Sequence, residues 1–164
     1  MSGDGSGYVD SCVFLAYIND EPERADVVEN LLARAASGDL VLSTSVLSIA
    51  EVYYAVAEAE ELSLPAQPDQ RIADLFDDRA VLQLVELSTV VATAAHALLR
   101  RSRSLPRASP TVPDAIHLAT AEYVGAEEFL TYDAPLIALA QRLGLPFTAS
   151  APSYPEGAQA SLLP

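Results

Sequence analysis

The chain has 164 residues, of which 51% are hydrophobic, and this is enough for one domain with a buried core. Its formal net charge of −14 would repel a nucleic-acid backbone at long range, which disfavours a nucleic-acid partner. A single cysteine, Cys12, excludes an internal disulfide, no export leader is visible, and no run of about 18 apolar residues could cross a membrane, so we expect a cytoplasmic protein.

Short apolar runs alternate along the chain with longer stretches whose apolar residues recur at helical spacing, and they predict strands and helices in turn. The expected strands lie at residues 8–10, 39–44, 81–87 and 127–131, with a short last one at 145–150. The expected helices lie at residues 22–37, 44–62, 71–80, 88–104, 113–123 and 134–144, and a helix or turn begins at residue 11. This alternation is typical of an α/β domain with a largely parallel sheet.

The segments around these elements complete the organisation of the chain. Residues 1–6 are rich in glycine and precede any strand, so we expect a flexible leader there and a loose, proline-containing tail at 151–164. Two proline-containing stretches, 62–70 and 104–113, are expected to be connections, and Pro113 suits the first position of the helix that follows. We therefore expect one domain over residues 7–150.

Four acidic residues stand where an apolar element meets a turn or where an acid is unexpected. Asp10 ends the first strand, Asp133 follows the fourth, Asp114 opens an otherwise apolar helix, and Glu51 interrupts another. Each has an ordinary structural explanation, because Asp often caps a helix or favours its positive end, and Glu51 could face solvent. However, ligands of such sheets bind beyond the carboxyl ends of the strands, where the three aspartates would meet.

If the four carboxylates converge, their repulsion costs several kcal/mol unless a cation neutralises it. Oxygen-only ligands suit Mg²⁺ or Mn²⁺, whereas zinc would need histidines and cysteines, of which the chain offers two distant His and one Cys. One or two such ions could polarise a phosphodiester, lower the pKa of water and hold the leaving oxygen. The pattern therefore predicts a metal-dependent nuclease.

Competing phosphate chemistries lack their residues. A phosphoaspartyl phosphatase would need DxDx[TV] after the first strand, but Asp10 is followed by Ser11 and Cys12. A receiver domain and a P-loop both need a lysine, and the chain has none. Cleavage through an activated 2′-hydroxyl usually needs two acid–base histidines, and nothing pairs His96 with His117. A serine or cysteine nucleophile has no GxSxG turn to support it.

The stretches that carry the four acids resemble the acidic motifs of PIN-domain proteins, most closely those of VapC-type toxin ribonucleases. They are YVDSCVFLAY, SxxAEVYYAV, PDAIHLATA and FLTYDAPL, in that order along nearly the whole chain. The resemblance implies a three-layer α/β/α sandwich with a mainly parallel central sheet and RNA cleavage that depends on Mg²⁺ or Mn²⁺. It also implies a homodimer held inactive by a cognate antitoxin, as the toxin of a type II toxin–antitoxin pair.

The resemblance also suggests roles for individual residues. It makes three aspartates metal ligands, namely Asp10, Asp114 and Asp133. It makes Glu51 a fourth ligand or the group that orients the attacking water. Two hydroxyl residues would support the acids, Ser11 and Thr131. His117, one helical turn after Asp114, is expected to serve packing rather than chemistry.

All nine cationic side chains are arginines, and four of them crowd the stretch before Thr111, namely Arg100, Arg101, Arg103 and Arg107. They could form an RNA-binding lip for phosphate beside Asp114, or they could simply belong to a helix end and a solvated loop. The alternative function is a non-catalytic PIN-like binding module, whose acidic pocket receives a metal or a partner's arginine. The net charge of −14 favours that alternative.

Overall fold

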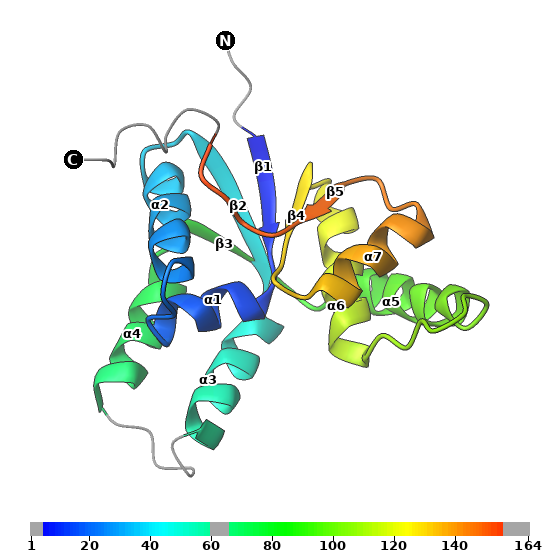
Figure 1. Ribbon diagram of the computed structural model, residues 1–164, viewed down its shortest axis with the longest axis horizontal. Coiled ribbons are helices and arrows are strands. Elements are labelled where there is room, and N and C mark those ends of the chain that lie inside the picture. The colour runs from blue at the N-terminus through cyan, green and yellow to red at the C-terminus, as the bar shows by residue number, and fades with distance from the viewer. Residues whose placement is uncertain (1–4, 60–65, 156–164) are drawn as a thin grey trace.

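The computed structural model describes residues 5–59 and 66–155, which form one parallel sheet covered by helices on both faces (Figure 1). The strands are β1 (Gly5–Val9), β2 (Leu40–Ser45), β3 (Leu82–Val85), β4 (Glu128–Leu130) and β5 (Thr148–Ser150). The helices are α1 (Ser11–Ile18), α2 (Arg24–Ala36), α3 (Leu47–Ala59), α4 (Ala66–Asp77), α5 (Thr89–Ser102), α6 (Val112–Val124) and α7 (Ala134–Leu143). The predicted α/β class with a parallel sheet is confirmed.

The strands pair in the order β3-β2-β1-β4-β5, and every pair is parallel. The first three strands therefore progress outward in one direction, after which the chain returns and adds β4 on the other side of β1. Figure 1 shows α1 to α4 on one side of the sheet and α5 to α7 on the other. This is a three-layer α/β/α sandwich, and it follows from right-handed crossovers that run in opposite directions from β1.

Two hydrophobic cores, one on each face, hold the layers together. Alternate residues of a strand point to opposite faces, so Val9 packs among α1 to α4 while Tyr8 packs among α5 to α7. Tyr8 stacks on Phe129 of the neighbouring β4, with ring centroids 5.5 Å apart. Both Tyr8 and Phe129 are fully buried, and they anchor the face of the sheet that carries α6.

Several element boundaries differ from the sequence-based expectation. β1 begins at Gly5, within the predicted leader, because Gly5 and Ser6 pair with Leu40 and Val41 of β2. α4 begins at Ala66, so the second part of the predicted connection 62–70 is helical. Pro68 does not prevent this, because a proline in the first turn of a helix removes no helical hydrogen bond. The rest of the leader, the tail from residue 156 and residues 60–65 lie outside the described residues.

Two further boundaries move by a residue or more. β2 continues through Ser45, and α3 starts at Leu47 rather than at residue 44 or 45. Pro113 occupies the second helical position of α6, not the first, because Thr111 is the N-cap. In the part of the chain that the structure describes, no helix has the length and apolar character to span a membrane.

Candidate functional site

The strand order reverses between β1 and β4. In open α/β sheets, ligands bind in the crevice beyond the carboxyl ends of the strands at such a point. Asp10 directly follows β1, and Thr131 directly follows β4. The backbone N–H of Asp10 donates to the carbonyl of Leu130 at 3.0 Å, so the two strand ends are held side by side. Of the two other elements that supply predicted acids, α3 follows β2 and α6 precedes β4.

Asp10 is buried and its carboxylate accepts from four donors. It caps α1, accepting from the backbone N–H of Ser11 at 2.8 Å. The hydroxyl of Thr131 donates to Oδ2 at 2.7 Å, and the thiol of Cys12 donates to the same oxygen at 3.2 Å. Only 6% of Asp10 is exposed, so these hydrogen bonds compensate for the hydrogen bonds to water that the carboxylate loses on burial. The predicted supporting hydroxyl of Thr131 therefore contacts an acid directly, and that of Ser11 lies 3.4 Å from Oδ1.

Glu51 lies across the crevice and is held by His117, a residue that the sequence assigned to packing. The Nε2 atom of His117 is 2.6 Å from Oε2 of Glu51 and 3.7 Å from Oδ1 of Asp10. The Nδ1 atom is 2.7 Å from the hydroxyl of Tyr8, which accepts from the backbone N–H of Ser45 at 3.0 Å. His117 is indeed buried in the core, but both of its ring nitrogens are engaged, and it links β1, β2, α3 and α6.

The surroundings of His117 favour its charged form. Burial lowers the pKa of His117, whereas the hydrogen bond to Glu51 and the charges of Asp10, Glu51 and Asp114 raise it, and the net pKa is raised above its ordinary value. All three of these acids thus act on one imidazole. Burial raises the pKa of Tyr8, so this residue keeps its proton and can donate to His117 when the imidazole is neutral.

Asp114 and Asp133 approach the crevice from two helix starts. Asp114 forms a capping box with Thr111, accepting from the backbone N–H of Thr111 at 2.7 Å. Asp133 caps α7, accepting from the backbone N–H of Leu136 at 3.1 Å, and its own N–H donates to the hydroxyl of Thr131 at 3.1 Å. Asp114 and Asp133 line a common cavity of about 350 Å³.

The four acids are therefore joined by shared neighbours rather than scattered over the molecule. His117 lies between Asp10 and Glu51, Thr131 contacts both Asp10 and Asp133, and one cavity contains Asp114 and Asp133. The structural explanations that the sequence left open also hold, because all three aspartates bond to the start of a helix. A capping role and a chemical role can coexist, since a carboxylate oxygen has lone pairs for more than one partner.

The donor set fits an oxygen-seeking cation in kind. Asp10 and Glu51 flank His117, and Asp114 and Asp133 line one cavity, so the candidate donors are carboxylate oxygens. Burial raises the pKa of the Cys12 thiol to about 12 and keeps it protonated, so the nearby cysteine does not change this chemistry. In the arrangement shown, however, the carboxylates bond to hydroxyls, backbone N–H groups and His117. No group of three or more His, Cys, Asp and Glu side chains within residues 5–59 and 66–155 is set to hold a metal.

The arginines that were predicted to form one RNA-binding lip do not all line the same cavity. Arg107 lines the cavity that contains Asp114 and Asp133, whereas Arg100 and Arg101 line a different cavity on the outer side of α5. The guanidinium of Arg101 donates to the carbonyl of Leu143, which ties α5 to α7. Arg142 of α7 lines the cavity beside Asp114, although no motif in the sequence identified it.

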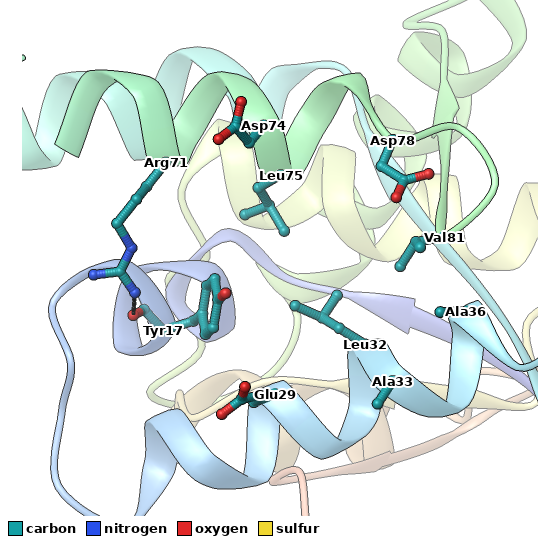
Figure 2. Close-up of a pocket in the computed structure, with 10 residues that line it drawn as sticks. All are labelled: Tyr17, Glu29, Leu32, Ala33, Ala36, Arg71, Asp74, Leu75, Asp78 and Val81. Atoms are coloured by element: carbon teal, nitrogen blue, oxygen red, sulfur yellow. Dashed lines mark hydrogen bonds between the residues drawn. The ribbon is translucent and has the colours of Figure 1, made fainter. Parts of the chain in front are cut away.

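A third cavity, of about 380 Å³, lies between α2 and α4 and contains none of the four acids (Figure 2). Leu32 and Leu75 project between the two helices, and Glu29, Asp74 and Asp78 stand around them. Arg71 closes one end by donating to the carbonyl of Tyr17 at 3.0 Å. Its apolar walls and lack of convergent catalytic groups separate it from the acidic crevice.

The fold and the crevice together define an α/β/α domain with acidic residues at the switch point of its sheet. The sequence matches the PIN domain over residues 7–146. The chain belongs to the PIN-domain family. No curated protein matches it.

Solved structures of low sequence identity share the fold. VapC20 of Mycobacterium tuberculosis, described as a toxin that cleaves the sarcin–ricin loop, is 17% identical with a TM-score of 0.64, and the match covers 80% of this chain and 93% of VapC20. FitAcB of Neisseria gonorrhoeae is 15% identical with a TM-score of 0.62, and coverage is 89% and 97%. A toxin–antitoxin complex from Klebsiella pneumoniae is 18% identical with a TM-score of 0.60, and coverage is 91% and 99%.

Proposed function

We propose that this PIN-domain protein is an endoribonuclease that hydrolyses RNA phosphodiesters with Mg²⁺ or Mn²⁺. One observation carries the proposal. Asp10 and Glu51 flank the imidazole of His117, while Asp114 and Asp133 line one cavity, and the four acids come from the starts of α1, α6 and α7 and from α3. Structural roles alone do not require helix caps and Glu51 to gather at one edge of the sheet. A site for Mg²⁺ or Mn²⁺, in contrast, needs oxygen ligands brought close together, and carboxylates supply them.

The three aspartates have different surroundings, and these indicate a different part for each in binding the metal. Asp10 is fixed by Thr131 and Ser11 and is the ligand with the least freedom to move. Asp114 and Asp133 face a cavity that a substrate can enter, and they complete the ligand set. When bound, the cation neutralises these carboxylates, polarises the phosphodiester and makes water a better nucleophile at neutral pH.

Glu51 is the group that orients the attacking water, and His117 positions it. Nε2 of His117 contacts only one of the two carboxylate oxygens of Glu51, Oε2, so the other is left for water or the cation. Tyr8 fixes the imidazole from the opposite side. Side chains held in this way need little reorganisation during the reaction.

The test is RNA cleavage by the purified chain with Mn²⁺ and with EDTA. Wild type should cleave single-stranded RNA only with Mn²⁺ and leave a 5′-phosphate on the product, because hydrolysis by water does not need the 2′-hydroxyl. Asp10→Asn should lose cleavage. Asp74→Asn is the matched control, since Asp74 is an exposed aspartate of α4 outside the crevice. Cleavage that survives EDTA, or that persists in Asp10→Asn, would contradict the proposal.

We further propose that the protein is the toxin of a type II toxin–antitoxin pair. Complexes of toxin with antitoxin are among the structures that share its fold. A basic segment of a cognate antitoxin would be attracted to a chain of net charge −14, and one of its arginines could compete with the metal for the carboxylates. Expression should arrest growth, and a small basic protein encoded next to the gene should co-purify and relieve the arrest. A cytoplasmic location remains a prediction. The homodimer also remains a prediction, and light scattering tests it.

A second candidate is a non-catalytic binding module. The high negative charge favours it, as does the engagement of the carboxylates by protein groups in the described residues. Isothermal titration with Mn²⁺, run beside the cleavage assay, separates the two functions. Metal binding without RNA turnover supports the module, and turnover supports the nuclease.

A further inference from the structure

The cavity beside Asp114 and Asp133 holds two arginines for which the chemistry proposed above has no use. It is lined by the loop before α6 and by α7, and it contains both Arg107 and Arg142. These are two of the nine cationic side chains in a protein of net charge −14. Cations are scarce in this chain, so their placement beside two candidate metal ligands indicates an anionic occupant.

Arg142 fixes one wall of the cavity. One Nη atom donates to the carbonyl of Pro106 at 2.8 Å, which ties α7 to the loop before α6. A guanidinium has five N–H donors, so this bond leaves most of them for another acceptor. The side chain is exposed, and the apolar part of the cavity next to it is formed by Pro110, Leu136 and Leu139.

Arg107 is held in place by its backbone rather than by side-chain contacts. Its φ is 58°, in the left-handed region that residues other than glycine seldom adopt. Its guanidinium makes no hydrogen bond or ion pair with any residue in 5–59 or 66–155. The loop thus presents a cation without a protein partner to the cavity that contains Asp114.

Other arginines of the described chain are engaged or lie elsewhere. Arg24 pairs with Glu21, Arg71 pairs with Asp20, and Arg101 donates to Leu143. Arg100 lines the separate cavity on α5. Within this set, Arg107 and Arg142 are distinguished by a shared cavity next to the acids.

We propose that this cavity is a ribonucleotide subsite, in which Arg107 and Arg142 bind a phosphate of the RNA strand next to the bond that is cleaved. The proposal rests on the ribonuclease function and names where the strand lies. A guanidinium suits this task because its planar set of donors can bind two phosphate oxygens at once. The volume of about 350 Å³ is within the usual range for small-ligand sites, about 300–1,000 Å³. The apolar wall can pack against a ribose or base.

The subsite also reconciles the acidity of the chain with an RNA substrate. Long-range repulsion of the strand is offset only where local cations contact phosphate. Two arginines beside the acids hold the backbone at the point where hydrolysis takes place. Specific positioning, rather than general attraction, is then the source of affinity.

The experiment measures binding of a fluorescent single-stranded RNA of about ten nucleotides by anisotropy, with Ca²⁺ replacing Mg²⁺ to slow hydrolysis. The variants are Arg107→Gln, Arg142→Gln and both together, and Arg100→Gln is the control because it removes the same charge from another cavity. Each cavity variant should weaken binding about tenfold, as expected for a lost charge-assisted hydrogen bond. The slope of log affinity against log salt should fall by about 0.7 for each lost phosphate contact.

Two controls keep the outcomes distinct. Arg107→Gln breaks no hydrogen bond or ion pair among the described residues, so its melting temperature should equal that of wild type. Its Mn²⁺ binding should be at least as tight as that of wild type, because a positive charge beside Asp114 and Asp133 is removed. An equal loss in Arg100→Gln, or wild-type affinity and salt slope in the double variant, would overturn the subsite. If such a double variant still cleaves RNA, the nuclease function stands without the subsite. If wild type neither binds nor cleaves RNA, the proposed function itself fails.

Discussion

The hydrogen bond between Tyr8 and His117 allows a quantitative test of the network that holds Glu51. The hydroxyl of Tyr8 accepts from Ser45 N–H at 3.0 Å and lies 2.7 Å from Nδ1 of His117, and both side chains are buried. Tyr8→Phe leaves two buried groups without a partner, the Ser45 N–H and the imidazole Nδ1. His117→Leu leaves no such group, because the Tyr8 hydroxyl still accepts from the Ser45 N–H. Combined, the substitutions leave only the Ser45 N–H.

The magnitude follows from counting these groups. A buried polar group that loses its partner costs about 1–3 kcal/mol. The two single variants together leave two such groups, whereas the double variant leaves one, so the difference is one group. The double variant should therefore be less destabilised than the sum of the single variants by about 1–3 kcal/mol. Glu51 contributes little to this difference, because its side chain is 25% exposed and can bond to water after His117 is removed.

Urea unfolding of the metal-free protein, with the two single variants and the double variant, gives the coupling energy directly. A control cycle pairs Tyr8→Phe with Ser88→Ala, which removes the cap of α5 and shares no hydrogen bond with Tyr8. The control should be additive within about 0.5 kcal/mol. If the Tyr8–His117 cycle is equally additive, the two residues do not act as a unit, and the positioning role of His117 is refuted.

Three other predictions test separate parts of the structure. Asp114→Asn should abolish RNA cleavage. It should change the free energy of unfolding of the metal-free protein by no more than about 1 kcal/mol, because an amide oxygen can still accept from Thr111 and only the charge at the helix start is lost. A decrease in that free energy of more than about 2 kcal/mol, measured by urea unfolding, would show that the role of Asp114 is mainly structural. The pKa of His117 is raised above its ordinary value of 6.5, so its contribution to stability is complete below that pH and is lost as the pH rises through the folded-state pKa. Melting temperatures should fall across that window in wild type, and the fall should be absent from His117→Leu. Gly125→Ala should cost about 1 kcal/mol in urea unfolding, because φ is +67° at the end of α6, and Gly125→Asn should cost less.

The local sequence was sufficient to predict most strands and helices, and it predicted the helix starts at which Asp114 and Asp133 lie. The Thr111-x-Pro113-Asp114 stretch predicts a helix start, and Asp133 followed by Pro135 predicts another, because caps and first-turn prolines act over three or four residues. Alternation of strands and helices then brings the three aspartates to the carboxyl edge of a parallel sheet. The boundary at Gly5 was missed because pairing with β2 extends β1 beyond its local signal. The boundary at Ala66 was missed because Pro68 suggested a connection, although a proline is tolerated in the first turn of a helix.

The amino-acid sequence by itself determined the fold class and the order of the four acidic motifs, since both depend on patterns only a few residues long. Only the tertiary structure decided which side chains contact the acidic residues of these motifs. Tyr8 and His117 are 109 residues apart, and Arg142 reaches the loop of Arg107 from a different helix. Such contacts arise because β4 returns to pair with β1, and no periodicity within a single element encodes that pairing.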